Sequence, residues 1–476
     1  MGTLILDLRF GLRMMAKNPG FTAVAIVTLA LGTSAATMIF SVIYNVLLDP
    51  FPYTDAKRIV LIEIHDVNDS GPYGRSWFSI PEFLDYQEQN HVFDGVIGTT
   101  GEEVRYTTGA ATEHFRGAYL TPNTFHVLGV PALLGRGITP DDSSPGAPPV
   151  FVMSYKLWLR RYNLDPTVLG RTYILNDKPR TLVGIMPPRF TKLAADLWMP
   201  AALDRSDPEA RQRYFMFQAH LKPGITLPQA EADINVIARR LAQVYPKEYP
   251  SKFTIRIVTW LDYLVGPFRR ILYTLAAAVA LLLLIACSNV ANLLLVRGTS
   301  RQREMAIRAS LGASRWTLLR QLLIESLLLA LSGAAAGCLV AYSGIKALVT
   351  LIPEGAIPGE AVISLNMPVL LFSLGAAGFT ALLFGLAPAL QTSKRDLAES
   401  MKDSAKGVTG GFRHGKLRNA LAVIEMALSL VLLAGAGLLM RSFVGLLQVD
   451  LGLNPKNVLA AFPSFPPKQY KTVAAK

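Results

Sequence analysis

The segment Phe21–Leu48, which reads FTAVAIVTLALGTSAATMIFSVIYNVLL, contains no charged side chain. A helix that spans a bilayer needs about 20 consecutive apolar residues, so this segment is long enough to cross a membrane. Arg9, Arg13 and Lys17 precede it and the small residues Ser34–Ala36 lie within it, a pattern that also occurs in cleavable signal peptides. The apolar stretch continues to Leu48, however, which is too long for the apolar part of a signal peptide. We therefore predict an uncleaved membrane anchor.

Four more segments have a similar length and composition. They are Ile271–Val296, Leu318–Leu351, Pro368–Leu390 and Leu417–Met440. The whole chain of 476 residues is 51% apolar and only 17% charged, whereas a soluble domain carries roughly 25% charged residues. This composition excludes a disordered chain and a small disulfide-bonded scaffold, and it argues against a freely soluble enzyme. We predict a multi-pass α-helical membrane protein.

The positions of lysine and arginine predict how the chain is oriented. The formal net charge is +13, and the basic residues gather beside the apolar segments, so we expect membrane lipid rather than nucleic acid as a partner. They occur in the first 20 residues, after the second apolar segment and after the fourth, whereas residues 352–367 contain none. Because cytoplasmic loops carry the excess of basic residues, we expect a cytoplasmic N-terminus and an extracytoplasmic segment 49–268.

The extracytoplasmic segment 49–268 alternates short strand patterns with turns and a few helices. Arg171–Leu175 and Thr181–Ile185 flank Asn176-Asp177, which predicts a β-hairpin. Residues Thr254–Thr259 alternate around two isoleucines and predict a strand that leads directly back to the membrane. The segment is therefore expected to fold as a large α+β domain.

One helix of this domain has a clear start signal. Thr226 can cap the helix, and Gln229 completes a capping box. Apolar side chains then recur at helical spacing and predict one buried face. They are Ala230, Ile234, Ile237, Ala238 and Leu241.

The same domain shows no catalytic or metal-binding pattern. Its histidines have neither HExxH nor His-x-His spacing, and the chain contains no GxSxG motif. Asp141-Asp142 is an acidic pair, but serine, proline and glycine surround it, as in a solvated loop. Both cysteines, Cys287 and Cys338, fall within apolar segments, so we expect packing roles for them and no disulfide. Binding or docking is the function that this domain predicts.

The segment 301–311, RQREMAIRASL, follows the second apolar segment and reads as a short helix. Glu304 and Arg308 are four residues apart in the favourable order, and Ile307 and Leu311 share an apolar edge. Such a helix would lie at the cytoplasmic membrane surface.

The residues that follow can end this helix and begin the next. Gly312 can end a helix, and Ser314 can cap a helix that runs into the third apolar segment. The residues alone leave two interpretations open: a docking helix braced between two spans, or a basic loop on anionic lipid.

Gly410–Lys416 has the G-x-x-x-x-G-K spacing of a phosphate-binding loop. The next residue is Leu417, where serine or threonine would ligate magnesium, and no strand pattern precedes the glycines. We interpret this stretch as part of a basic cytoplasmic linker. The chain is expected to hold no nucleotide or other cofactor of its own.

Together these features resemble the MacB/FtsX-like permease family of ABC transporters, over nearly the whole chain. Residues 303–314, REMAIRASLGAS, resemble the family signature after the second span. Four further stretches resemble the duplicated orphan branch of the family. They are Asn18–Phe21 (NPGF), Gly146–Pro149 (GAPP), Gly184–Pro188 (GIMPP) and Leu221–Thr226 (LKPGIT). The resemblance implies a MacB-like periplasmic core domain and a place in the bacterial cytoplasmic (inner) membrane.

The resemblance also implies a function and a site. Residues 301–311 would be the coupling helix that docks on a separate ABC ATPase subunit, which binds the ATP. The expected contact residues are Arg303, Glu304, Ile307, Arg308, Leu311 and Gly312. The chain would be a non-enzymatic permease of an export system, which passes motion from the ATPase to the outer domain. A second permease copy or homodimer and a periplasmic adaptor are further implied partners.

Two other functions share this topology. An FtsX-like signalling permease would activate an extracytoplasmic hydrolase and transport nothing. A lipoprotein-releasing permease would extract lipid-modified cargo. The outer domain, at about 220 residues, is of the size expected for the exporter-like form rather than for the smaller division regulator.

The expected organisation follows from these segments. It comprises a cytoplasmic segment 1–20, a first span 21–48, the MacB-like core domain 49–268, an FtsX-like permease domain 271–390, a basic linker 391–416, a fifth span 417–440 and an extracytoplasmic tail 441–476. In the duplicated branch the fifth span opens a second copy, whose outer domain needs on the order of 200 residues. Residues 441–476 are too few for it, so a truncated second copy is expected.

Overall fold

The computed structural model describes residues 2–69, 71, 73–108, 111–206, 213–300, 307, 310, 314–351, 358–393 and 412–448. The chain forms two compact units, Met1–Thr409 and Gly410–Lys476. The described part of the second unit is the single long helix α12, Phe412–Leu447. The first unit contains a helical bundle and a sheet-based domain.

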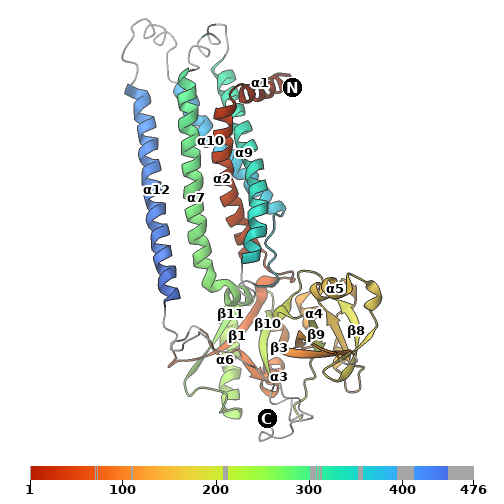
Figure 1. The fold of residues 1–476 in the computed structure, drawn as a ribbon. Coiled ribbons are helices and arrows are strands. Elements are labelled where there is room, and N and C mark those ends of the chain that lie inside the picture. The colour runs from red at the N-terminus through yellow and green to blue at the C-terminus, as the bar shows by residue number, and fades with distance from the viewer. Residues whose placement is uncertain are drawn as a thin grey trace. The chain divides into compact units, whose positions relative to one another are not determined.

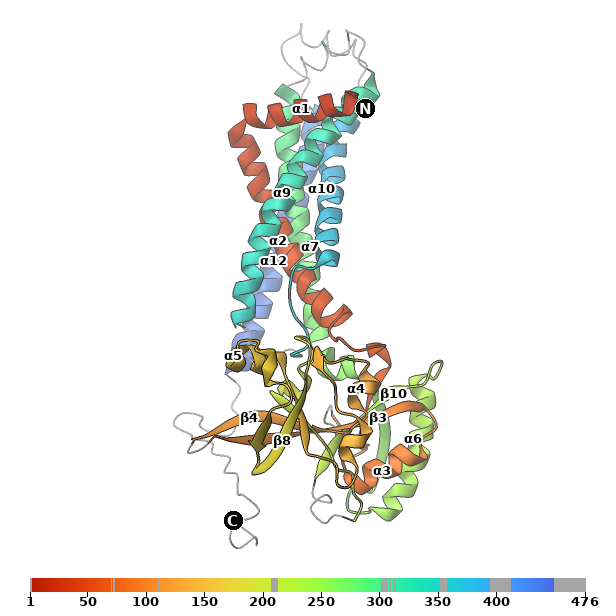
Figure 2. The same cartoon turned by 90° about the vertical axis from the view of Figure 1, so that its right-hand side faces the viewer.

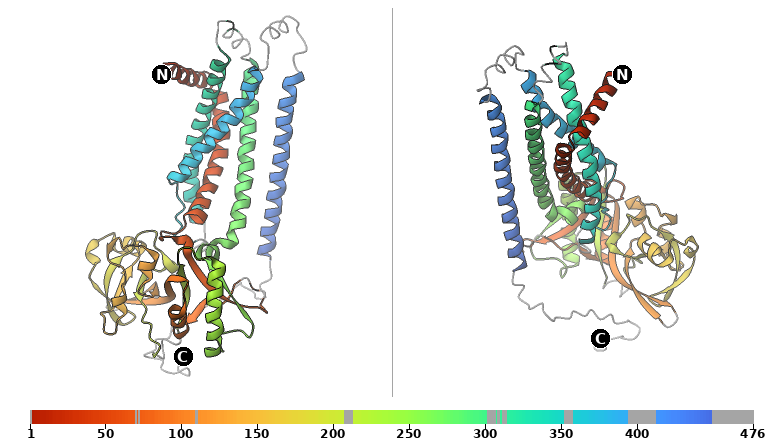
Figure 3. Two further views of the ribbon diagram at one scale, coloured as in Figure 1. Left: turned by 180° about the vertical axis from the view of Figure 1, so that it is seen from behind. Right: turned by 45° about the horizontal axis from the view of Figure 1, so that its top comes forward.

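Four long helices form the bundle of the first unit. They are α2 (Pro19–Ile43), α7 (Trp260–Ser300), α9 (Arg315–Leu351) and α10 (Met367–Ser393), and they run side by side (Figure 1, Figure 3). Among the described residues, four helical stretches are long and apolar enough to cross a membrane: Pro19–Leu48, Phe268–Arg297, Leu319–Leu351 and Ala422–Ser442. A shorter apolar stretch, Met367–Leu383, lies in α10. The predicted fold class, a multi-pass helical membrane protein with a large α+β domain, is confirmed.

Small and polar side chains hold α2 against its neighbours. A Cβ atom placed on Gly337 of α9 would lie 2.2 Å from Thr33 Oγ1 and 3.0 Å from the Ala30 carbonyl oxygen, so α9 packs closely against the backbone of α2. Thr37 Oγ1 and Ser373 Oγ are 2.8 Å apart, which joins α2 to α10. In lipid, where the hydrophobic effect does not drive helices together, close packing and interhelical hydrogen bonds supply the association energy.

A short helix, α1 (Gly2–Lys17), precedes α2 and lies across the end of the bundle (Figure 2). The chain turns at Asn18 and Pro19, because proline is favourable only in the first turn of a helix. The Asp7 carboxylate forms an ion pair with Arg320 of α9, with 2.7 Å between Asp7 Oδ2 and Arg320 Nη2. This contact fixes α1 to the bundle.

Within the described part of the chain, eleven strands form one mixed sheet of order β11-β1-β10-β3-β4-β9-β6-β8-β5. In addition, β2 pairs with β10, and β7 pairs with β3 and β8. The strands are β1 (Ile59–Asp66), β2 (Trp77–Ser79), β3 (Phe93–Thr108), β4 (Ala111–Leu120), β5 (Leu134–Gly135), β6 (Val150–Met153), β7 (Thr172–Leu175), β8 (Lys178–Ile185), β9 (Leu197–Pro200), β10 (Tyr214–Leu221) and β11 (Phe253–Thr259). The pairs β4–β9 and β6–β8 are parallel, and the other pairs are antiparallel.

The sheet separates two apolar cores. The α-helices described in this domain are α3 (Ile80–Gln89), α4 (Thr124–Leu128), α5 (Tyr155–Tyr162) and α6 (Leu227–Val244). Single turns are η1 (Tyr44–Leu48), η2 (Ala56–Arg58), η3 (Pro140–Ser143), η4 (Pro166–Val168) and η5 (Lys192–Ala194). The first core packs α3 and α6 on the sheet around Phe217 (Figure 2). The second contains Phe190, Trp198 and Trp260 and adjoins the start of α7.

Local sequence signals are confirmed in this domain. Strands β7 and β8 form the predicted hairpin, and both of its turn residues, Asn176 and Asp177, have positive φ, as a type I′ turn requires. Thr226 and Gln229 form the capping box of α6, and the five apolar residues predicted for its buried face are all buried. Strand β11 runs into α7 without a loop, because Thr259 ends the strand and Trp260 begins the helix.

Candidate functional site

The predicted docking segment is only partly described. Arg303, Glu304, Arg308, Leu311 and Gly312 lie outside the described residues. Ile307 is helical and 54% exposed, so its side chain is available to a partner. Ser314 caps α9 as predicted, since its Oγ accepts a hydrogen bond from the Thr317 N–H at 3.2 Å.

One member of the acidic pair Asp141-Asp142 in the outer domain, Asp142, has a structural role. Arg136 donates two hydrogen bonds to the Asp142 carboxylate, at 2.6 and 2.8 Å, and the Thr139 N–H donates a third at 2.8 Å. Burial alone would raise the pKa of Asp142, but these hydrogen bonds and the Arg136 charge lower it. Across the residues that the structure describes, no three metal-ligating side chains come together.

Residues 187–195 of the outer domain contact the ends of three membrane helices. Arg189 donates to the Asp49 carbonyl oxygen at 2.8 Å, directly after α2 and η1 end. Thr191 lies against the linker between α9 and α10, because a Cβ atom on Gly359 would be 2.6 Å from its Oγ1. Lys192 lies over the ring of Trp260, the first residue of α7, with 5.4 Å between Nζ and the ring centroid.

We call this contact region the joint. It consists of Asp49, Tyr53, Arg189, Thr191, Lys192, Gln218, Trp260, Gly359 and Glu360. Three parts of the bundle contribute to it: the exit of α2, the entry to α7 and the α9–α10 linker. A displacement of any of these helix ends therefore changes contacts to residues 187–195.

Lys192 is the most deeply buried charge of the joint, with only 2% of its surface exposed. Its Nζ donates to Gln218 Oε1 of β10 at 2.5 Å. Burial lowers the pKa of Lys192 to about 8, although the charge of Glu360 acts in the opposite direction. A lysine is rarely buried without a carboxylate partner, because burial of an unpaired ammonium group costs free energy.

Glu360 belongs to the α9–α10 linker and is 5% exposed. Tyr53, which follows α2 in the chain, donates its hydroxyl hydrogen to Glu360 Oε1 at 2.9 Å. Burial and the neighbouring Glu360 carboxylate raise the pKa of Tyr53, so the phenol stays protonated and remains a donor. This hydrogen bond links the linker to the root of the outer domain.

The backbone next to Lys192 is strained. Leu193 has φ 60° and Ala194 has φ 50°, a left-handed conformation that non-glycine residues rarely adopt. Such residues cost on the order of 1–3 kcal/mol each and persist only where the surroundings hold them. Here Trp198 Nε1 donates to the Lys192 carbonyl at 3.1 Å, and the Ala194 N–H donates to Thr191 at 2.7 Å.

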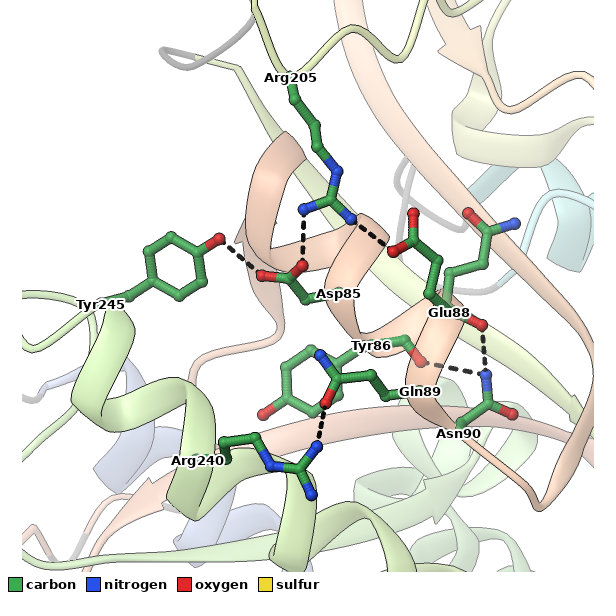
Figure 4. Close-up of polar contacts among 9 residues, drawn as sticks. Asp85, Tyr86, Glu88, Gln89, Asn90, Arg205, Arg240 and Tyr245 are labelled. Carbon is green, nitrogen blue, oxygen red and sulfur yellow. Dashed lines mark hydrogen bonds and ion pairs between the residues drawn. The ribbon is translucent and has the colours of Figure 1, made fainter.

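A second polar cluster, between α3 and α6, has a simpler role (Figure 4). Arg205 donates to Asp85 at 2.6 Å and to Glu88 at 2.8 Å, and Tyr245 donates to the other oxygen of Asp85 at 2.6 Å. Arg240 of α6 donates to Gln89 of α3 at 2.9 Å. These contacts clamp two helices and a loop of the outer domain together.

The domain content is decided by comparison with known families. Residues 22–237 match the profile of the MacB-like periplasmic core domain, and residues 276–397 match that of the FtsX-like permease C-terminal domain. The chain belongs to the MacB/FtsX-like ABC permeases. A permease is a membrane component, which agrees with the apolar helices of this chain.

Named relatives fit the same family. The macrolide export ATP-binding/permease protein MacB of Chromobacterium violaceum is 27% identical over 234 residues, 48% of this permease and 34% of that protein. The uncharacterized ABC transporter permease YknZ of Bacillus subtilis is 26% identical over 322 residues, 64% of this chain and 75% of that one. This permease thus spans about a third of the length of the MacB protein.

A solved structure is also similar. The periplasmic region of MacB from Actinobacillus actinomycetemcomitans superposes with a TM-score of 0.34 at 15% identity, over 45% of this permease and 93% of that chain.

Sequence reasoning did not find the joint of this permease. Lys192 was one lysine among many, and its neighbours Gln218 and Glu360 are distant in the chain. One signal was present: residues 352–367 carry no basic residue, so a buried carboxylate at Glu360 has no cationic partner within the linker.

Proposed function

We propose that this chain is the permease subunit of an ABC-type export system, in which a separate subunit hydrolyses ATP and the permease passes the resulting motion to its outer domain. The matches to a MacB-like core domain and an FtsX-like permease domain support the class of function. The name of the Chromobacterium relative, an export ATP-binding/permease protein, supports export as the process and an ATP-binding component as the partner.

The proposed coupling of the cytoplasmic side to the outer domain rests on one observation, the direct connection of β11 to α7. Thr259 Oγ1 donates to Asp262 Oδ2 at 2.7 Å and accepts from the Asp262 N–H at 3.0 Å, so strand and helix are locked where they meet. Helix α7 then continues for 41 residues, about 60 Å at 1.5 Å per residue, to Ser300. A movement of residues 301–311 would therefore reach the sheet without a flexible link.

The docking residues are part of the proposal. Glu304 and Arg308 would make polar contacts with the ATPase, and Ile307 and Leu311 would be packed against it. Arg303 would add a further basic contact, and Gly312 would permit the turn that follows. The exposure of Ile307 supports this assignment, since an apolar side chain exposed beside a charged segment gains energy when a partner covers it.

Co-purification tests the docking assignment. The tagged permease is expected to bring down an ATPase subunit from membranes, and Glu304→Gln with Arg308→Gln should reduce its recovery at least tenfold. The matched control is Lys57→Gln with Glu103→Gln, which also removes one charge of each sign but in the outer domain. Equal recovery with both double variants would refute the docking site. Co-purification of a cell-wall hydrolase without any export phenotype would favour the signalling alternative.

A further inference from the structure

The joint contains hydrogen-bond donors that lack acceptors. Within the described residues, the buried Gln218 Nε2 and Trp260 Nε1 have no partner, and the buried hydroxyl of Thr191 has none either. The Lys192 ammonium group has three N–H donors. Within the described residues only one of them is used, in the hydrogen bond to Gln218 Oε1. Buried donors without acceptors are costly, so this arrangement favours any state that brings an acceptor to them.

Glu360 is the carboxylate placed to supply that acceptor. Gly359, which precedes Glu360, lies against Thr191, which precedes Lys192, because a Cβ atom on Gly359 would be 2.6 Å from Thr191 Oγ1. The charge of Glu360 accordingly acts on Lys192, yet these two described side chains form no ion pair within 4.0 Å. The partner of Glu360 in this structure is Tyr53. The acceptor and the unpaired donors are thus neighbours in one buried region.

The backbone around Glu360 is built for a small displacement. Residues 361–366 of the linker have no regular secondary structure and run from the joint to α10 (Figure 2). On the other side, Leu193 and Ala194 hold strain beside Lys192, and strained backbone of this kind gathers at sites that switch. On the Glu360 side, no helix or strand has to unfold before the linker residues can move.

We propose that Glu360 is a two-position latch: its carboxylate accepts from Tyr53 in the state seen here and pairs with Lys192 in a second state, in which the α9–α10 linker has moved toward the start of α7. In the second state the carboxylate satisfies Lys192 and comes within reach of the unpaired donors of Gln218 and Trp260. Tyr53 then turns to water or to another acceptor. The latch is a bistable contact between the bundle and the outer domain, which any driving subunit would bias.

Distances between spin labels test the latch in the purified full chain, without any ATPase. Labels are placed on the exposed positions Val362 of the linker and Val236 of α6, after Cys287 and Cys338 are replaced by alanine. The unmodified latch is expected to give two distance populations. Tyr53→Phe should shift their ratio about fivefold toward the state paired with Lys192, the factor expected for one lost hydrogen bond. Lys192→Met should shift the ratio in the opposite direction.

The opposite signs are the diagnostic result, because a purely structural cluster would respond to both substitutions in the same way. Tyr245→Phe is the control, since it removes a similar bond to a carboxylate, Asp85, away from the joint. If Lys192→Met does not fold, Trp260→Phe removes an unpaired donor and should shift the ratio in the same direction. One distance that neither substitution changes, or shifts of equal sign, would overturn the latch. Either result would leave the proposed export function standing, because no ATPase takes part in the measurement.

Discussion

The contact between α2 and α9 permits one sharp test of the bundle, the substitution Gly337→Ala. The added Cβ would be 2.2 Å from Thr33 Oγ1 and 3.0 Å from the Ala30 carbonyl oxygen. The first distance is about 1.2 Å short of the 3.4 Å at which ordinary contact begins. Thr33 cannot simply turn away, because its hydroxyl donates to the Leu29 carbonyl at 2.7 Å and its side chain is β-branched. The two helices must therefore separate or rotate.

The size of the effect follows from three terms. Overpacking a close contact costs about 1–3 kcal/mol, and loss of an interhelical hydrogen bond in a membrane costs about 0.6 kcal/mol. Alanine is in turn about 1 kcal/mol better than glycine within a helix. The control Gly375→Ala, on α10, gains the same helix preference without a clash, since nothing lies within 4 Å of its added Cβ. We expect the free energies of unfolding of the two variants to differ by about 2–4 kcal/mol.

Unfolding of the full chain in mixed micelles by increasing dodecyl sulfate, followed by far-UV circular dichroism, measures this difference. Gly337→Ala should unfold at lower dodecyl sulfate than the unmodified chain, and Gly375→Ala at the same or higher concentration. Equal shifts for the two variants would show that α2 and α9 do not pack closely at Gly337.

Three further predictions concern the outer domain. Arg75→Met should lower the free energy of unfolding of this domain by about 3–5 kcal/mol, because Arg75 makes a bidentate pair with the fully buried Glu82. Faster hydrogen exchange in α3 would show this loss of stability. The double variant Arg75→Met with Glu82→Gln should recover part of it. The folded pKa of Lys192, about 8, lies below its ordinary 10.5, so between these values the unfolded chain holds a proton that the folded chain has lost. The free energy of unfolding should thus rise by about 3 kcal/mol from pH 8 to pH 10.5 in the unmodified chain, relative to Lys192→Met; parallel pH profiles would contradict this. The pKa of Asp142 is lowered in the folded chain, so this residue should add stability above its ordinary pKa and lose that contribution as the pH falls through the folded pKa. Asp142→Asn should therefore remove this loss of thermal stability at acid pH. An unchanged dependence of the melting temperature on pH would contradict the pair with Arg136.

The features that sequence predicted are those that depend on neighbouring residues. The capping box at Thr226 and the turn at Asn176 each need only a few consecutive residues, and each is present as expected. The apolar length of α7 and α9 is likewise a local property, since a bilayer imposes it on each helix separately. These signals were enough to predict a multi-pass fold with an α+β outer domain.

The features that sequence missed depend on long-range packing. Helix α1 is fixed by the pair of Asp7 with Arg320, which only the bundle brings together. The parallel pairs β4–β9 and β6–β8 require crossovers that a strand pattern does not reveal. In the joint, Lys192 owes its burial to Trp260 and Gln218, both far along the chain. Burial of a polar group by distant residues leaves no periodic pattern.

The proposed orientation places the outer domain and the docking segment on opposite sides of a membrane. Labelling of single cysteines in intact cells by a membrane-impermeant maleimide tests it most directly, with Cys287 and Cys338 replaced by alanine. Val236→Cys, on the exposed face of α6, should react in intact cells, whereas Ile307→Cys should react only after the membrane is permeabilised. Reaction of both positions in intact cells, or of neither, would rule out this orientation.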